Sequence, residues 1–362
     1  MINVMTKNIK KFHFPLISFF FLMINFCLPA AAAVILQYHH VSENTPKSTS
    51  ITPAQFEKHL QYLADEGFRV VALSTLIHAL EQKAELPDKT VAITFDDGYI
   101  DNLTYAKPLL DKFNYPFTIF INPAIIDRNS DSYLSWQQLK TLADQGVIIA
   151  NHGFNHDSLA RIPQGLSQQA WLEQRGAAIL KAEEVIKQHT GQSWRYFAYP
   201  YGEFTQEVEQ WLSDNNFIAF GQQSGAVGSN TRLTSIPRFP ASQPYDKLAG
   251  LRDKLNSLPL AVEPIGITAN ALFKHGELTS AEFKVISDDI NPKQLSCYVT
   301  GIGRQNVVWS NDSLFKIVFN ADLPSGRVRA NCTAPSIEHA GRYYWYSQAW
   351  MILKPNGDWY PL

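Results

Sequence analysis

The chain has 362 residues, 45% hydrophobic and 18% charged, so it can bury a sizeable core and is not intrinsically disordered. With 31 basic and 33 acidic residues its net charge is −2, which argues against nucleic-acid binding because such proteins usually carry a basic patch. Three cysteines are too few for a disulfide scaffold or a cysteine zinc array.

The first 33 residues have the pattern of a secretory signal. Three lysines precede an apolar run over 14–28, and small residues at 29–33 suit cleavage after an A-x-A sequence. The run is short for a membrane span, which needs about 20 apolar residues, and an uncleaved anchor is the alternative. We therefore predict a signal peptide over 1–33 and an exported protein, periplasmic or extracellular, which can associate peripherally with the cell envelope.

Residues 34–258 alternate short apolar strands with amphipathic helices. The expected strands are 34–38, 90–95, 117–121, 147–150, 196–199 and 217–220. Helix caps are expected at Thr52, Ser74, Ser135 and Ser167, and the last of these helices runs to about residue 189. Strand–helix alternation over this length predicts an α/β fold whose parallel sheet closes into a distorted (β/α) barrel, rather than an open sheet.

The pattern changes after Pro259. A proline-containing linker is expected over 259–264, and residues 265–362 are expected to form a second domain. Alternating runs separated by turn signals predict an all-β, immunoglobulin-like sandwich there, with strands at 265–269, 296–300, 306–309, 314–319, 327–332 and 343–353. Cys297 and Cys332 both fall in this region. In an exported protein such a pair is most simply a disulfide, with two buried free thiols as the alternative.

Acid and imidazole groups follow three of the expected strands at their C-terminal ends, and the segment Pro200-Tyr201-Gly202 follows a fourth. The acid and imidazole groups are His39 and His40, Asp96 and Asp97, and His152 and His156. In a (β/α) barrel all these strand ends open onto one mouth, so groups far apart in sequence converge there. Two histidines four residues apart and one carboxylate can hold a cation and leave positions open for water and substrate. The joint placement predicts a catalytic metal site, with the second, adjacent carboxylate free to act as a base.

Over residues 34–250 the chain resembles the polysaccharide deacetylases, carbohydrate esterase family four with its NodB homology domain. The motifs that carry the resemblance are Thr94-Phe95-Asp96-Asp97-Gly98, His152-x-x-x-His156 and Pro200-Tyr201-Gly202. It is greatest to the secreted bacterial poly-N-acetylglucosamine deacetylases. The resemblance implies that Asp97, His152 and His156 hold one divalent metal ion. Zinc is the metal expected, with cobalt, nickel, manganese or iron as alternatives. The resemblance also implies that Asp96 is the base and that the backbone N–H of Tyr201 stabilises the oxyanion.

The chain departs from the family pattern at two places. The arginine expected two residues before Pro200 is replaced by Ala198. Arg238 is expected to supply the missing charge, and Arg195 is the less favoured candidate for this role. The alternative for Arg238 is a role at the surface or at the domain interface. The family's terminal histidine motif is also missing, but the first strand, ending in His39, resembles that motif moved to the front, as in the circularly permuted branch. His39 is therefore the predicted general acid, with a structural hydrogen-bonding role or an extra metal ligand as alternatives, and His40 is predicted to pack.

These features predict metal-dependent hydrolysis of N-acetyl groups from an amino-sugar polysaccharide. Poly-N-acetylglucosamine, chitin-type glycans and peptidoglycan all carry the reacting group, and the oligomeric state is left open. Sugar contacts are expected from Tyr99, Trp136, Tyr199 and Pro200, although core packing explains Trp136 equally well. Two other functions stay open: a non-catalytic glycan-binding or assembly protein on this scaffold, and another metal-dependent amide hydrolase.

Overall fold

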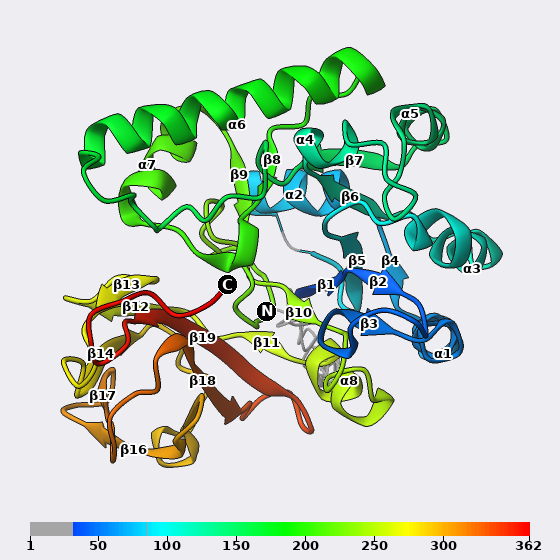
Figure 1. Cartoon of the computed structure of the whole chain (residues 1–362). Coiled ribbons are helices and arrows are strands. Elements are labelled where there is room, and N and C mark those ends of the chain that lie inside the picture. The colour runs from blue at the N-terminus through cyan, green and yellow to red at the C-terminus, as the bar shows by residue number, and fades with distance from the viewer. Residues whose placement is uncertain (1–31, 85) are drawn as a thin grey trace, which may run out of the picture.

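The computed structural model describes residues 32–84 and 86–362, so nearly all of the predicted signal segment lies outside the described residues. The chain forms an α/β domain followed by an all-β domain, and its C-terminal end lies where the two domains meet (Figure 1). Within the described ranges, no helix combines the length and the apolar character that crossing a bilayer requires.

A curled parallel sheet organises the α/β domain. Its strand order is β10-β1-β5-β6-β7-β8-β9, with β4 beside β5. The strands are β1 Ala33–Tyr38, β4 Arg69–Val70, β5 Thr90–Phe95, β6 Thr118–Ile121, β7 Ile148–Asn151, β8 Tyr196–Ala198, β9 Ile218–Phe220 and β10 Phe239–Pro240. The segment 236–240 contacts two strands that lie far apart in this order. Ile236 forms a bridge with Phe220 of β9, and Phe239 lies opposite Leu36 of β1. The predicted parallel α/β fold is confirmed, and this segment links the two edges of the sheet.

Helices connect the strands. They are α1 Pro53–Asp65, α2 Leu73–Glu81, α3 Lys107–Lys112, α4 Pro123–Ile126, α5 Trp136–Asp144, α6 Gln168–Thr190, α7 Gln206–Asp214 and α8 Leu248–Leu255, with the π-helical turn η2 Asn102–Ala106 before α3. The side chains of Thr52, Ser135 and Ser167 accept hydrogen bonds from the first turns of their helices, as predicted. The cap predicted at Ser74 is wrong, because α2 begins at Leu73 and Ser74 lies within its first turn.

The alternation of side chains along the strands separates two apolar layers. Ile35, Ala92 and Ala150 belong to one core cluster, inside the curled sheet, together with residues of α2. Their neighbours along the strands pack in a second cluster with residues of α1, α3 and α5. Because side chains two residues apart share a face, this parity carries Gln37, Asp96 and His152 to the inner side at the carboxyl end of the sheet. The strand pattern therefore positions the polar groups of the site.

The all-β domain contains nine strands. They are β11 Leu258–Pro259, β12 Val262–Ile265, β13 Ala271–Phe273, β14 Ser280–Val285, β15 Ser296–Val299, β16 Gly303–Trp309, β17 Leu314–Val318, β18 Gly326–Pro335 and β19 Tyr343–Ile352. The first half of β16 pairs with β15 and its second half with β17, which joins the two halves of the domain around one core. The linker predicted over 259–264 is instead largely strand, since β11 pairs with β19 and β12 with β14.

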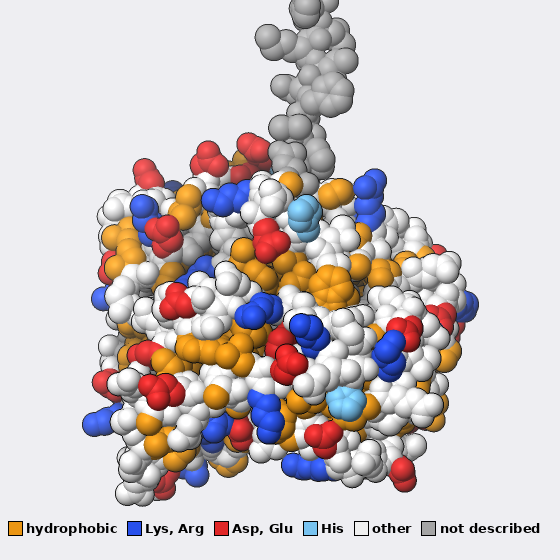
Figure 2. All heavy atoms as spheres, turned by 90° about the horizontal axis from the view of Figure 1, so that it is seen from above, with side chains coloured by type: hydrophobic (Ala, Val, Ile, Leu, Met, Phe, Trp, Pro, Cys, Tyr) orange, Lys and Arg blue, Asp and Glu red, His pale blue; other side chains and the backbone are white. Residues whose placement is uncertain are grey.

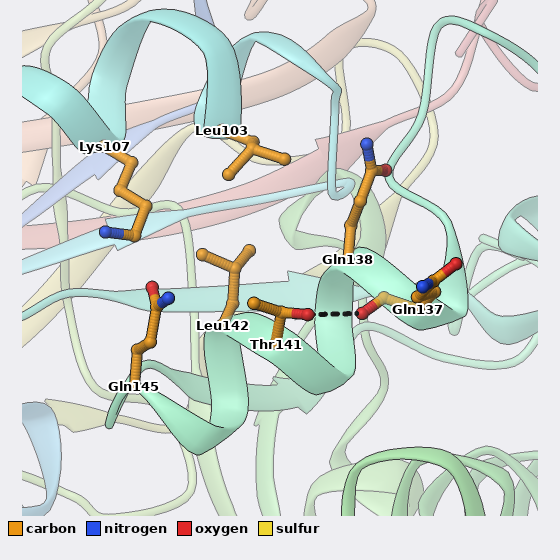
Figure 3. Close-up of a pocket in the computed structure, with 7 residues that line it drawn as sticks. All are labelled: Leu103, Lys107, Gln137, Gln138, Thr141, Leu142 and Gln145. Atoms are coloured by element: carbon orange, nitrogen blue, oxygen red, sulfur yellow. Dashed lines mark hydrogen bonds between the residues drawn. The ribbon is translucent and has the colours of Figure 1, made fainter.

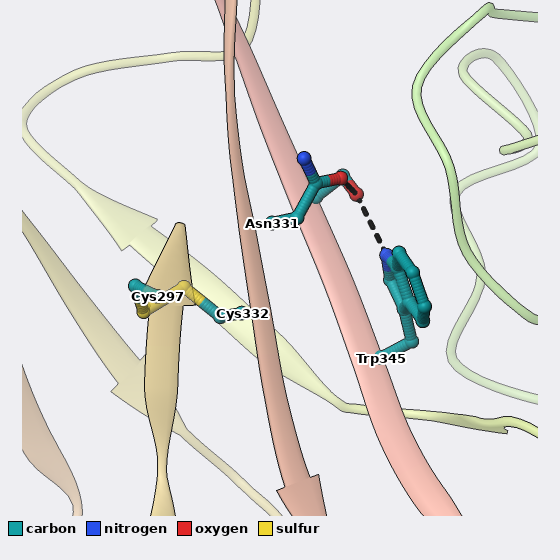
Figure 4. Close-up of a disulfide and its surroundings, with 5 residues drawn as sticks. Cys297, Asn331, Cys332 and Trp345 are labelled. Carbon is teal, nitrogen blue, oxygen red and sulfur yellow. Dashed lines mark hydrogen bonds between the residues drawn. A yellow bond between two sulfur atoms is a disulfide. The ribbon is translucent and has the colours of Figure 1, made fainter. Parts of the chain in front are cut away.

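The predicted disulfide is confirmed. Cys297 of β15 lies directly opposite Cys332 of β18, and their sulfur atoms are bonded in the core of the domain (Figure 4). A polar chain lies beside it, in which the Trp345 indole N–H donates to the Ser347 hydroxyl and that hydroxyl donates to Asn331. The bridge therefore staples two neighbouring antiparallel strands.

Charged side chains are mixed on the outer surface above α6. On this face, lysines and arginines are interspersed with aspartates and glutamates, and apolar side chains lie between them (Figure 2). Charge on this face is therefore balanced locally, as the composition of the whole chain suggests.

Candidate functional site

Three of the predicted ligands converge. Oδ1 of Asp97 lies 3.4 Å from Nε2 of His152 and 3.3 Å from Nε2 of His156. Two ligands bound at about 2.1 Å in a tetrahedral arrangement lie about 3.4 Å apart, so the spacing fits one divalent cation. Nδ1 of His152 lies 2.8 Å from the carbonyl oxygen of Ala198. Since a carbonyl oxygen can only accept a hydrogen bond, Nδ1 carries the proton and Nε2 is left available as a ligand. The donor set is therefore arranged to hold a metal ion.

The backbone at the site is in a sparsely populated conformation. Asp97, His156 and Tyr201 have φ values of 74°, 58° and 59°, in the left-handed region that residues other than glycine rarely adopt. Gly98 has φ 72°, and a Cβ there would lie 2.8 Å from Cγ2 of Ile121. The Asp-Asp-Gly motif is thus explained by a left-handed turn pressed against β6, which directs the second aspartate toward the two histidines.

The electrostatics of this group favour a cation. Burial raises the pKa of Asp97, but hydrogen bonds from His152 and His156 outweigh burial and hold that pKa well below its usual range. Burial lowers the pKa of His152, yet the hydrogen bond that it donates to Asp97 and the charge of Asp96 leave that pKa raised. Both shifts show that positive charge is stabilised where the three side chains meet.

Asp96 is fully buried beside this group and is paired with Arg238. The guanidinium donates from Nη1 to Oδ1 at 2.7 Å and from Nη2 to Oδ2 at 2.8 Å. Its Nε donates to the carbonyl of Gly221, and its Nη1 also contacts the hydroxyl of Thr94. Burial raises the pKa of Asp96, but Arg238 and the nearby histidines lower it to about 2. Asp96 is therefore an ionised carboxylate in a fixed orientation.

Arg238, rather than Arg195, makes this contact. Arg195 instead donates to the carbonyl of Asn215 and lies over the ring of Phe217. The guanidinium that pairs with Asp96 thus comes from the segment that joins β9 to β10.

Gln37 is a site residue that the sequence reasoning missed. Its Nε2 donates to Oδ2 of Asp96 at 2.7 Å, and the side chain is buried in β1. A signal for it exists, because Gln37 is a polar residue with inward parity in an otherwise apolar strand.

His39 lies at the carboxyl end of β1, beside Asp96. Its Nε2 is 3.9 Å from Oδ2 of Asp96. Burial lowers the pKa of His39 more than the charges of Asp96 and Asp97 raise it. His40 points elsewhere: its Nδ1 is 2.6 Å from Oδ2 of Asp101, and its ring stacks on Tyr99 at 3.5 Å.

The predicted oxyanion residue Tyr201 and one predicted sugar contact, Tyr99, lie beside the site. The ring of Tyr201 packs edge-on against His156 at 4.4 Å. Tyr99 is half-buried and stacks between His40 and Tyr133. These two tyrosines border the residues that would hold the metal.

The structure does not bring the other predicted sugar contacts into an open mouth. Tyr199 is fully buried, stacks on Phe204 and donates to the carbonyl of Thr234, so it packs in the core. Strand parity explains this correction, because Tyr199 follows the outward-facing parity of β8. Trp136 stacks on His189 of α6, and Pro200 is buried over Gly153.

A surface pocket of about 300 Å³ lies between η2 and α5, away from this group. It is lined by Leu103, Lys107, Gln137, Gln138, Thr141, Leu142 and Gln145 (Figure 3). None of these seven residues was predicted as a site residue or belongs to the Asp97, His152 and His156 group.

Comparison of the chain with known proteins identifies its family. The chain is 30% identical over 209 residues to YxkH of Bacillus subtilis, a protein named after the polysaccharide deacetylases, and the match covers 58% of this chain and 71% of that protein. The chain belongs to the polysaccharide deacetylase family. Residues 83–219 match the family directly, and its members are hydrolases.

Other relatives agree with this assignment. The poly-β-1,6-N-acetyl-D-glucosamine N-deacetylase of Staphylococcus epidermidis is 26% identical over 235 residues, which cover 58% of this chain and 79% of that enzyme. The structure of IcaB from Ammonifex degensii shares the fold with a TM-score of 0.56 at 24% identity, over 63% of this chain and 98% of that one. The peptidoglycan-N-acetylglucosamine deacetylase of Bacillus cereus and the poly-β-1,6-N-acetyl-D-glucosamine N-deacetylase of Escherichia coli are matched over only 42% and 36% of their own length, respectively.

Proposed function

We propose that this deacetylase removes N-acetyl groups from an amino-sugar polysaccharide, poly-N-acetylglucosamine first, with chitin-type glycans and peptidoglycan as alternatives. The observation that carries the proposal is the convergence of Asp97, His152 and His156 beside the buried pair of Asp96 and Arg238. The N-deacetylase of Staphylococcus epidermidis, named for poly-β-1,6-N-acetyl-D-glucosamine, supports the choice of glycan.

Asp97, His152 and His156 would hold one divalent cation, with zinc as the first choice and cobalt, nickel, manganese or iron as alternatives. When bound, such an ion supplies Lewis-acid chemistry, polarising the acetamide carbonyl and making water more acidic. His152 is held in the tautomer that ligation needs by its hydrogen bond to the carbonyl of Ala198.

The remaining groups handle protons and charge. Asp96, ionised and oriented by Arg238 and Gln37, accepts a proton from the attacking water at its carboxylate. Nε2 of His39 gives a proton to the departing amine, which is otherwise a poor leaving group. Because burial favours its neutral form, His39 takes up that proton during the reaction, and Asp96 lies 3.9 Å away as its source. The backbone N–H of Tyr201 stabilises the oxyanion.

Several further assignments belong to the same proposal. The protein is exported by a signal peptide over 1–33 and acts in the periplasm or outside the cell, where it can associate with the envelope. Residues 34–258 are the deacetylase domain, and residues 265–362 are an immunoglobulin-like accessory domain. Tyr99 and Tyr201 contact the sugar, which their positions beside Asp97 and His156 support.

The test is acetate release, measured in parallel on poly-N-acetylglucosamine, chitin oligomers and N-acetylated peptidoglycan. We expect release from at least one glycan, fastest from poly-N-acetylglucosamine, with free amines appearing in equal amount. Binding of a glycan without release of acetate would instead show a non-catalytic binding protein. Release of acetate only from small amides would show a different amide hydrolase.

A further inference from the structure

Glu203 follows the Pro200-Tyr201-Gly202 segment directly and is completely buried. Its Oε2 accepts hydrogen bonds from the hydroxyl of Ser158 at 2.6 Å and from Nε of Arg161 at 3.0 Å. Its Oε1 accepts from Nη2 of Arg161 at 2.9 Å and from the hydroxyl of Tyr360 at 2.8 Å. A buried carboxylate with this many donors is held in one place, because losing a donor would leave buried charge uncompensated.

These contacts join two loops of the site. Ser158 and Arg161 follow His156 closely in the chain, whereas Glu203 follows Tyr201. Backbone pairing supports the same junction, since the N–H of Thr205 donates to the carbonyl of Leu159 at 3.1 Å. Glu203 therefore ties the loop that carries a metal ligand to the loop that carries the oxyanion donor.

The C-terminal tail completes this junction. The carbonyl of Tyr360 accepts a hydrogen bond from Nη1 of Arg161 at 2.8 Å. The guanidinium of Arg161 also lies over the rings of Trp359 and Tyr360, at 4.8 and 4.7 Å. Ala160 packs in one apolar cluster with Tyr360 and with Met351 of β19. The end of the chain thus sits on the loop after His156, where the two domains meet (Figure 1).

A second contact comes from strand β18 of the all-β domain. Alternate residues of β18, including Val328 and Ala330, are buried in the core of that domain, so Arg327 lies on the opposite face. From there its Nη1 donates to the carbonyl of Tyr201, and its Nε lies 4.0 Å from Oε1 of Glu203. Arg327 thus contacts the left-handed residue of the oxyanion loop itself.

We propose that the all-β domain is a working part of the active site, in which Arg327 and Tyr360 are positioning residues for the loops that carry Tyr201 and His156. This inference rests on the proposed deacetylase function. It assigns the domain a role in catalysis rather than only in covering the barrel. Neither residue touches the metal-ligand group directly, so each acts through the loops it contacts.

The test uses the full chain with Tyr360→Phe, which removes one hydroxyl, and Arg327→Met, which removes the contacts of Arg327 with Tyr201, Glu203 and Gln222. We expect kcat to fall about tenfold in each variant, with KM within about twofold, because supporting contacts of this kind usually change activity by about 10–100-fold. Amide hydrogen exchange over residues 201–205 should become faster, with little change elsewhere. Arg327→Lys keeps a donor for the Tyr201 carbonyl and should recover part of the lost kcat.

Arg342→Met is the matched control. Arg342 also joins the two domains, donating to Asp88 at 2.8 Å and to the carbonyl of Asn256, but Asp88 precedes β5 at the opposite end of the sheet. This variant should leave kcat and the amide hydrogen exchange of residues 201–205 unchanged. The inference is overturned if Tyr360→Phe and Arg327→Met match the control in kcat, or if exchange speeds up without loss of kcat.

A separate readout covers failure of the proposed function. If the unmodified protein releases no acetate from any glycan, the proposed function fails, and the inference is judged on zinc affinity by competition with a chelator. A zinc dissociation constant raised about tenfold in Tyr360→Phe, but not in Arg342→Met, supports the positioning of the His156 loop. Equal constants in the two variants overturn it.

Discussion

Arg238 and Asp96 stand 142 residues apart in the chain and form a bidentate ion pair with no solvent-exposed surface on either side chain. The pair joins the turn after β5 to the segment that links the sheet edges. It orients the carboxylate that lies next to Asp97, so one interaction contributes both to the closure of the fold and to the arrangement of the site.

Arg238→Met should therefore impair both stability and turnover. Leaving the Asp96 carboxylate buried without its partner should lower the free energy of unfolding by about 3 kcal/mol, measured by urea denaturation. Turnover should fall about 100-fold, because the base loses its orientation. Arg195→Met is the control, and its exposed side chain should cost at most about 0.5 kcal/mol. Equal effects of the two substitutions would contradict the role of Arg238.

The two adjacent aspartates should separate in a metal-binding assay. Asp97→Ala removes a ligand and should lose both metal and acetate release. Asp96→Asn should keep its metal and its fold while turnover falls about 1,000-fold, because only the proton acceptor is lost. Metal content by elemental analysis, set beside acetate release, checks this. Equal loss of metal in both variants would mean that the roles of the aspartates are reversed.

His39→Ala should retain metal and lose turnover about 100-fold on an acetamide, because the departing amine needs a proton. The loss should be smaller on an aryl acetate ester, whose leaving group needs little protonation. His40→Ala is the comparison, since His40 bonds to Asp101 and stacks on Tyr99. A larger defect on the acetamide in His40→Ala would place the acid elsewhere.

His59 should make stability depend on pH. It is fully buried between the hydroxyl of Tyr38, 3.0 Å from Nδ1, and the carbonyl of Asp246, 2.7 Å from Nε2. Burial lowers the pKa of His59 to about 4. An unfolded chain, with a pKa of about 6.5, binds more protons between these values, so the free energy of unfolding should fall by about 3 kcal/mol as pH falls through this window.

Urea denaturation at about pH 7.5 and about pH 4.5 tests this, with His59→Gln as the reference. Other groups also titrate in this range, so the informative quantity is the difference between the two proteins. The unmodified protein should lose more stability on acidification than His59→Gln. The same pH dependence in both would remove His59 from the account.

The sequence reasoning brought the three proposed metal ligands together because the carboxyl ends of parallel strands share one edge of the sheet. Asp97, His152 and His156 follow strands whose apolar runs are plain in the sequence, and the structure brings them together. Arg238 could be proposed because Ala198 left a position to fill. Tyr199 was wrongly expected to contact the sugar. It is two residues from Phe197 of β8, shares its side of the sheet and packs in the same apolar cluster.

Contacts between distant segments lay beyond the sequence patterns. Glu203, Arg161 and Tyr360 each look like ordinary polar residues in sequence, and no periodicity joins residue 360 to residue 203. Strand β14 was also missed, although its residues alternate between buried and partly or fully exposed positions. The contacts among Glu203, Arg161 and Tyr360 depend on how the two domains pack, which local pattern does not encode, whereas the alternation of β14 was a local signal that was overlooked.

In the proposed function, Asp97, His152 and His156 hold a metal ion that deacetylation requires. The most direct measurement is acetate release from poly-N-acetylglucosamine by protein stripped with a chelator, dialysed, and then reloaded with zinc. We predict no release from the stripped protein, and recovery at about one zinc per chain that fails in His156→Ala. Full release from stripped protein that contains no detectable metal would contradict the account.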